Sequence, residues 1–282
     1  MNKVIRAEFG RTINAGLIIA IAGIIFSICF DSFNDLIAGL RNGQGYVGYF
    51  FSNAAFGGMC THYMLPVFTA LPFSVSLCQE RNNKAVSYIV SREGKNRYIF
   101  AKFIVSAISG GFVAACGTVL LFLMLAMRFP IAGDEFEGAV VSDYFHEWSA
   151  VYYPQLYILT LSILAFCRGV IWSSLALCVS LYTSDFMVVL LSPFLGSYVL
   201  VRIFQIIRVP DMVRPDMILI GQVVIKSSGL TLLIAIAISL TIVTLIGAFF
   251  VGKMAENTNK SLLNCAYLMK YNSLRKKNTY EK

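Results

Sequence analysis

Apolar residues along the chain are gathered into long runs separated by short polar segments. Runs of about 17 residues or more are typical of membrane-spanning helices. They predict six spans, at residues 13–30, 56–77, 103–127, 156–182, 186–207 and 229–252. The fourth run is interrupted by one charged residue, Arg168. The chain is therefore expected to be an all-α polytopic membrane protein.

The charges between these runs predict which loops face the cytoplasm, because Lys and Arg accumulate on that side. Residues 79–103 carry six Lys and Arg against two Glu, and the tail from residue 253 carries seven against two Glu. Residues 128–153 carry one Arg against five Asp and Glu. Both termini are therefore expected in the cytoplasm. Residues 1–255 would form one transmembrane domain, and residues 256–282 a basic cytoplasmic tail.

Two shorter segments fit neither spans nor simple loops. Residues 3–11 place Ile5 and Phe9 on one helical face and predict an interfacial helix before the first span. The apolar run Met217–Ile225 is too short to cross a membrane, so we expect a re-entrant or interfacial segment before the last span.

Composition narrows the function classes. Charged residues make up 13% of the chain, against roughly 25% in soluble domains, which argues against a soluble enzyme. The net charge of +8 is explained by basic loops facing anionic lipid, so no nucleic-acid partner is expected. The chain has no phosphate-binding loop of the form G-x-x-x-x-G-K-[ST] and no set of metal ligands around its two histidines. Neither a catalytic site, a cofactor nor a metal is expected on it.

The basic segment after the second span contains a short amphipathic pattern. Val86, Ile89 and Val90 fall at positions i, i+3 and i+4, which predicts one helix with an apolar stripe. Such a helix either lies among lipid headgroups or docks into a groove on a cytoplasmic partner. Periodicity alone favours neither.

The same segment resembles the loop that follows the second span in type-2 ABC exporter permeases. The similar residues are Glu80, Lys84-Ala85-Val86, Tyr88-Ile89-Val90, Ser91-Arg92, Arg97-Tyr98 and Lys102. The six predicted spans, the N-terminal interfacial helix and the segment before the last span are also similar to that family.

The resemblance implies a permease subunit that works with a separate ABC ATPase, which would hold ATP and Mg²⁺. It would act as a homodimer, or as a heterodimer with a second permease, among the lipids of a bacterial plasma membrane. The cargo would be amphipathic: a peptide, an antibiotic or a lipid. Glu80 would anchor the coupling helix through Arg81 or Lys102. The residues implied in coupling to the ATPase are Glu80, Arg81, Lys84, Val86, Ile89 and Val90.

Arg168 needs a partner, because an ionisable group near the centre of a span costs at least about 2.5–3.5 kcal/mol on insertion scales. It either contacts an anionic substrate group in the transport path or at a dimer interface, or it binds carbonyls and hydroxyls of the bundle. His62 is a second candidate for the path. Ser106, Gly110 and Ala114, spaced by four, predict close helix packing.

Two other function classes remain open. A secondary transporter would be expected to carry acidic residues inside its spans, and the predicted spans have none. A non-transporting membrane sensor or assembly protein would have no need of the amphipathic cytoplasmic helix.

Overall fold

The computed structural model describes residues 2–42, 47–51, 58–83, 85–131, 153–221, 223, 225 and 227–280. Lys84 and most of the acidic loop, residues 132–152, lie outside the described residues. Every regular element in the described part is helical. The helices are α1 (Asn2–Thr12), α2 (Ala15–Asp31), α3 (Phe33–Asn42), α4 (Val47–Phe51), α5 (Met59–Ala70), α6 (Ser76–Asn82), α7 (Ala85–Glu93), α8 (Lys95–Ala126), α9 (Pro154–Val179), α10 (Phe186–Ile207), α11 (Pro215–Ile220) and α12 (Ser228–Tyr280).

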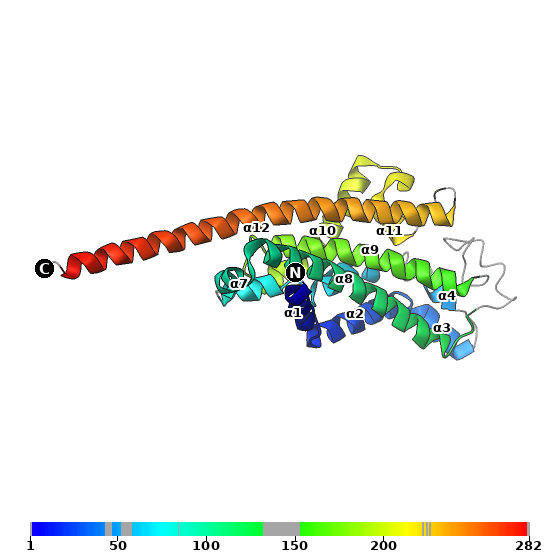
Figure 1. Cartoon of the computed structure of the whole chain (residues 1–282). Coiled ribbons are helices and arrows are strands. Elements are labelled where there is room, and N and C mark those ends of the chain that lie inside the picture. Colours follow the sequence, from blue (N-terminus) through cyan, green and yellow to red (C-terminus); the bar gives the residue numbers. More distant parts are fainter. Residues whose placement is uncertain are drawn as a thin grey trace.

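The helices lie roughly alongside one another in an elongated bundle, from which α12 projects (Figure 1). Four of them are long and apolar enough to cross a membrane: α8, residues 155–179 of α9, α10, and residues 228–257 of α12. They correspond to the predicted spans from the third to the sixth. A fifth candidate is the pair α1 and α2, bent by 56°, if the two count as one span. The prediction of six spans is not confirmed by this count.

The predicted second span, residues 56–77, is not one continuous helix. α5 ends at Ala70, residues 71–75 form turns, and α6 begins at Ser76. The break contains Pro72, which has no N–H to donate and whose ring clashes with the carbonyl four residues earlier in a helix.

Polar side chains from other helices bind to this break. Asn14, which caps α2, donates to the carbonyl of Pro72 at 3.4 Å. The Ser74 hydroxyl donates to the carbonyl of Ser173 at 2.9 Å and lies 3.1 Å from the hydroxyl of Ser106. Non-helical backbone inside a bundle requires such partners, because the apolar surroundings offer no water.

α8 and α9 cross with their backbones in close approach. A Cβ atom added to Gly110 would lie 2.3 Å from Cβ of Ser173 and 2.9 Å from the carbonyl oxygen of Gly169. Ser106 and Ala114, one turn to either side of Gly110, are fully buried. The close packing predicted from these small residues is confirmed.

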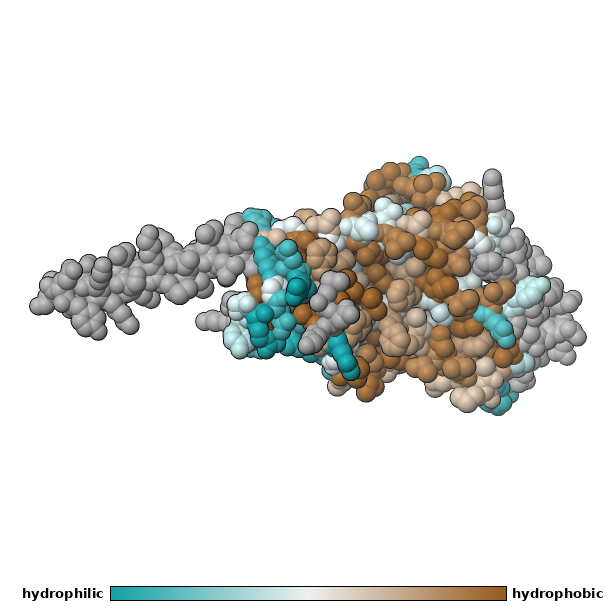
Figure 2. Space-filling view, in the orientation of Figure 1, coloured by the Kyte–Doolittle hydropathy of each residue, from teal (hydrophilic) through white to brown (hydrophobic). Residues whose placement is uncertain are grey.

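The outer surface of the bundle is strongly apolar. Phe112, Leu159, Leu195 and Leu245, one on each long helix, are all more than half exposed. In Figure 2 the helical body is mostly hydrophobic, whereas hydrophilic residues gather where α1 and α7 lie. We call this the α7 end. A surface of this kind indicates a membrane protein, since soluble monomers rarely expose large contiguous apolar areas.

Candidate functional site

The short helix α7 packs against α6, α8 and α12, with its apolar stripe facing inward. Val90 is 5% exposed, and Val86 and Ile89 are partly buried against the same cluster. That cluster draws on α6, α8, α9 and α12 and contains Leu77, Tyr98, Ile99, Leu177, Leu181, Phe250 and Met254. The three residues expected to enter a partner's groove thus contact this chain's own helices, and the partly buried Ile89 also lines an open groove.

The outward face of α7 is polar. Tyr88 is 69% exposed, and Ser91 and Arg92 are exposed beside it. The turn into α8 is made by Gly94 at a φ of +86°, a conformation that glycine adopts readily and other residues rarely. A partner approaching the α7 end would meet Tyr88 and Arg92 before it met the apolar stripe.

A charge network lies next to α7. The side chain of Lys102, on α8, is fully buried, and its Nζ lies 2.7 Å from Oε1 of Glu80 and 3.2 Å from Oε2 of Glu8. Arg11 bridges the same two carboxylates, with Nη1 2.8 Å from Glu80 and 3.2 Å from Glu8. The hydroxyl of Tyr98 donates to Oε2 of Glu80. Two cations thus balance two carboxylates across α1, α6 and α8.

Further contacts hold Lys102 in place. Its Nζ lies 4.8 Å from the ring centroid of Phe73, which is cation–π distance. Because the ammonium is fully buried, its charge depends on these protein partners for compensation. The network therefore fixes the N-terminal helix and the end of α6 to the long helix α8.

The structure distinguishes between the two predicted partners of Glu80. Lys102 forms the ion pair, whereas Arg81 donates to the carbonyls of Ser180 and Thr183, at 2.7 and 3.5 Å, in the turn between α9 and α10. Arg81 thus connects α6 to a different helix pair.

The contribution of α1 to this network was not predicted from the sequence. Ile5 and Phe9 were expected on the apolar face of that helix, but both are only partly buried. The buried positions are Val4, Glu8 and Thr12, spaced by four. Glu8, in the middle of this buried stripe, was the feature of the sequence that could have indicated a buried cation on a neighbouring helix.

An open groove of about 580 Å³ lies beside the network, between the α1–α2 region and α6–α7. Arg11 and Glu80 form part of its charged wall, and Pro72, Ile89 and Phe186 line its apolar part. The groove offers a partner both charge and apolar surface at the α7 end.

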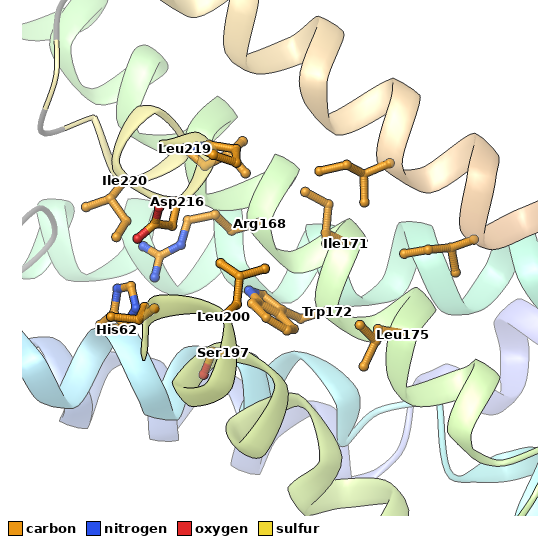
Figure 3. Close-up of a pocket in the computed structure, with 14 residues that line it drawn as sticks. His62, Arg168, Ile171, Trp172, Leu175, Ser197, Leu200, Asp216, Leu219 and Ile220 are labelled. Atoms are coloured by element: carbon orange, nitrogen blue, oxygen red, sulfur yellow. The ribbon is translucent and has the colours of Figure 1, made fainter. Parts of the chain in front are cut away.

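A second cavity, of about 140 Å³, lies between α5, α9, α10, α11 and α12 (Figure 3). Most of its wall is apolar and includes Ile171, Trp172, Leu200, Leu219, Ile242 and Ile246. The polar side chains that reach it are His62, Arg168, Ser197 and Asp216. Two predicted path residues, Arg168 and His62, are thus brought together.

The guanidinium of Arg168 points into this cavity, towards His62 and Asp216 (Figure 3). The residue is only 7% exposed. Among the described residues Arg168 forms no ion pair within 4.0 Å and no side-chain hydrogen bond, and the charge of Asp216 acts on it from a greater distance. The carbonyl and hydroxyl partners expected under the second interpretation of Arg168 are therefore not among the described residues.

The carboxylate of Asp216 already has a partner. Arg214 places Nη2 2.7 Å from Oδ2 of Asp216 and Nε 3.3 Å from Oδ1. The hydrogen bond with Asp216 raises the pKa of Arg214, so that its guanidinium stays charged. Arg214 also pairs with Asp211 at 3.3 Å, but that carboxylate is 70% exposed.

These acidic and basic groups are positioned by the helix before the last span. The segment predicted at Met217–Ile225 is seen as α11, which begins at Pro215 and ends at Ile220. Ile218, Leu219 and Ile220 are buried, and α11 contacts α9 and α12. Pro215 suits the first helical turn, and Gly221, at a φ of +87°, ends the helix.

No family model matches this chain, and no curated protein or solved structure shows significant similarity to it. The geometry of the two regions is therefore the basis for assigning a function.

Proposed function

We propose that this chain is the membrane-spanning permease subunit of a type-2 ABC exporter, moving an amphipathic substrate outward with energy from a separate ATPase. The observation that carries the proposal is the α7 end. There a short helix with a polar outer face packs on α6, α8 and α12 through its apolar face, next to a buried charge network. In this arrangement, a movement that a soluble partner imposes on α7 would be transmitted to several helices.

The mechanical argument starts from how α7 is held. Its inner face packs against α6, α8 and α12, and the same apolar cluster includes residues of α9, so a movement of α7 would displace the ends of these helices. The network fixes α1 and α6 to α8 at the same level. Because packed cores shift between discrete arrangements rather than deform continuously, pressure on Tyr88 and Arg92 would tilt helices as units.

The proposal includes six spans and both termini in the cytoplasm. In it, α5 and α6 together make the second span, broken at Pro72 and held by Asn14 and Ser74. α11 is a re-entrant segment against α9 and α12. The α7 end then faces the cytoplasm, where Lys and Arg predominate.

The partners follow from this assignment. Two copies of the permease, or one copy and a related chain, would bind two copies of the ATPase, which carries ATP and Mg²⁺. The membrane is that of a bacterial cell. The groove beside Arg11 and Glu80 offers the ATPase a second contact next to the outer face of α7.

Ion-driven transport is the alternative. The four long candidate spans contain one acidic residue, Glu256, and it lies within two residues of the end of the last span. The buried Asp216, on the re-entrant segment, is already paired with Arg214. Transporters driven by protons or sodium ions use carboxylates inside the membrane. The distribution of acidic residues therefore favours an external energy source.

Co-purification of an ABC ATPase with this chain from the bacterial membrane tests the proposal. Replacing both Tyr88 and Arg92 by glutamate should abolish co-purification and any stimulation of ATP hydrolysis, because both side chains are exposed and lie on the outer face of α7. The matched control is Arg128→Glu, an exposed arginine just beyond the other end of α8. Retention of the ATPase by the double variant at Tyr88 and Arg92, or its equal loss in the control, would contradict the proposal.

A further inference from the structure

We propose that the cavity at Arg168 binds an amphipathic anion, with a carboxylate or phosphate on the guanidinium and the adjoining apolar segment against α9, α10 and α12. The inference names the chemical class of the cargo, and in that respect it rests on the proposed function. The binding itself requires neither ATP nor a partner.

The charges around the cavity leave Arg168 without a carboxylate within ion-pair distance, and Asp216 acts on it only from farther away. Arg168 and Arg214 supply two guanidinium groups, whereas Asp216 is the buried carboxylate between them. Asp216 is engaged by Arg214 at 2.7 Å, and Asp211 lies on the exposed side. A buried cation without a close partner is costly, and an anion in the cavity would lower that cost.

The apolar walls of the cavity favour a ligand that carries an apolar segment next to its acidic group. Apart from His62, Ser197, Asp216 and Arg168 itself, the side chains lining the cavity are apolar or aromatic. A small hydrophilic anion would lose its hydration and gain only one ionic partner. An acid attached to an alkyl or aromatic group would gain the ionic contact and bury apolar surface as well.

The size of the cavity limits how much of the ligand enters. Its volume of about 140 Å³ is close to that of an engineered apolar cavity of about 150 Å³ that holds benzene. The acidic group and a short apolar segment fit, and the rest of the ligand must lie outside. Leu200, on the cavity wall, is itself 36% exposed, so the wall reaches the apolar outer surface.

The depth of Arg168 argues for cargo rather than a resident lipid headgroup. At about 1.5 Å per residue, Arg168 lies about 21 Å from the start of α9 and about 17 Å from its end. Lipid phosphates lie near the two faces of a bilayer whose apolar core is about 30 Å thick. A lipid at rest would therefore keep its headgroup well away from this guanidinium.

Trp172 provides a direct readout, because it lines the cavity one turn after Arg168. The chain has two tryptophans, so Trp148→Phe leaves Trp172 as the single tryptophan, which can be excited selectively over the tyrosines. The protein would be placed in phosphatidylcholine nanodiscs without ATPase or nucleotide and titrated with 2-bromododecanoate, whose bromine quenches tryptophan at short range. We expect saturable quenching by the acid and at least tenfold weaker apparent affinity for its methyl ester.

Variants separate the ionic contact from general partition into the bilayer. Arg168→Gln should weaken binding of the acid at least tenfold, and Arg168→Lys should retain most of the affinity. Arg128→Gln, an exposed arginine outside both proposed sites, should leave the affinity unchanged. Equal affinity of acid and ester for the protein with Arg168 intact would overturn the inference, whether or not any variant folds. If 2-bromododecanoate no longer quenches Trp172 in nanodiscs of the anionic lipid phosphatidylglycerol, the lipid itself occupies the cavity. That result would identify the ligand as a resident lipid and overturn the assignment to cargo.

Failure of this inference can be distinguished from failure of the proposed function. Absence of selective acid binding would reject this inference while leaving the binding of an ATPase to α7 intact. Acid binding without any ATPase partner would retain the site and reject the exporter.

Discussion

At the residue scale, the best-defined feature is the charge network of Glu8, Arg11, Glu80 and Lys102. Each carboxylate contacts both cations, and the Lys102 side chain is fully buried whereas that of Arg11 is 54% exposed. The two cations are therefore not equivalent. The Lys102 side chain has no access to water, so its position depends on the two glutamates that pair with it.

Replacing Lys102 by Met should lower the free energy of unfolding by about 3–5 kcal/mol, because two largely buried carboxylates would keep only the exposed Arg11. The midpoint of thermal unfolding in detergent measures this. Lys253→Met is the matched control: its partner Glu256, at 2.9 Å, is 46% exposed, and such surface pairs contribute about 0–1 kcal/mol. Equal stability of the two variants would show that the network is not structural.

A second prediction concerns Asp31, at the end of α2. Its carboxylate accepts from the backbone N–H groups of Cys60 and Thr61, at 2.9 and 2.6 Å, where α5 begins behind Gly58. It thus caps a helix that has no side-chain cap of its own. Asp31→Ala should cost about 0.5–2 kcal/mol in thermal unfolding, and Asp31→Asn less, since Asn is also a good cap. Equal losses in the two variants would argue against a capping role.

At the element scale, the bundle is organised by the close crossing of α8 and α9. Gly110→Ala would force a methyl group against Ser173 and the backbone of Gly169, so we expect a loss of about 1–3 kcal/mol. Gly252→Ala, in α12, is the control, because a Cβ there meets nothing within 4 Å. Its effect should be neutral or slightly stabilising. Thermal unfolding of both variants checks this, and an unchanged midpoint for Gly110→Ala would contradict the crossing.

The predicted helices differ in how well the sequence defined them. Continuous apolar runs without proline near their centres, as in the third and sixth spans, gave helices that contain most or all of the predicted ranges. The second run failed because hydropathy does not register that Pro72 interrupts the backbone ladder. Pro193 lies inside α10 without ending it, so proline alone does not locate a break. The break at Pro72 is stabilised by hydrogen bonds from Asn14 and Ser74. These bonds depend on tertiary structure and could not be predicted from the apolar run.

At the scale of the whole molecule, the sequence predicted an all-helical apolar chain with a short amphipathic helix after the second apolar run. Contacts between distant residues could not be predicted from periodicity. Glu8 meets Lys102 across 94 positions, and the apolar stripe of α7 is covered by helices of the same chain. Arg168 was identifiable as an ionisable residue in an apolar run, but its placement opposite His62 and the paired Asp216 required the fold.

The central claim is that the outer face of α7 is where an ATPase acts. Photo-crosslinking from a benzophenone amino acid at position 88 tests it most directly, with position 127, exposed just beyond the other end of α8, as the comparison. The account predicts a product from position 88 that contains an ATPase with a phosphate-binding loop, and no such product from position 127. Crosslinks from position 88 only to lipid or to this chain, or the same ATPase captured from both positions, would contradict it.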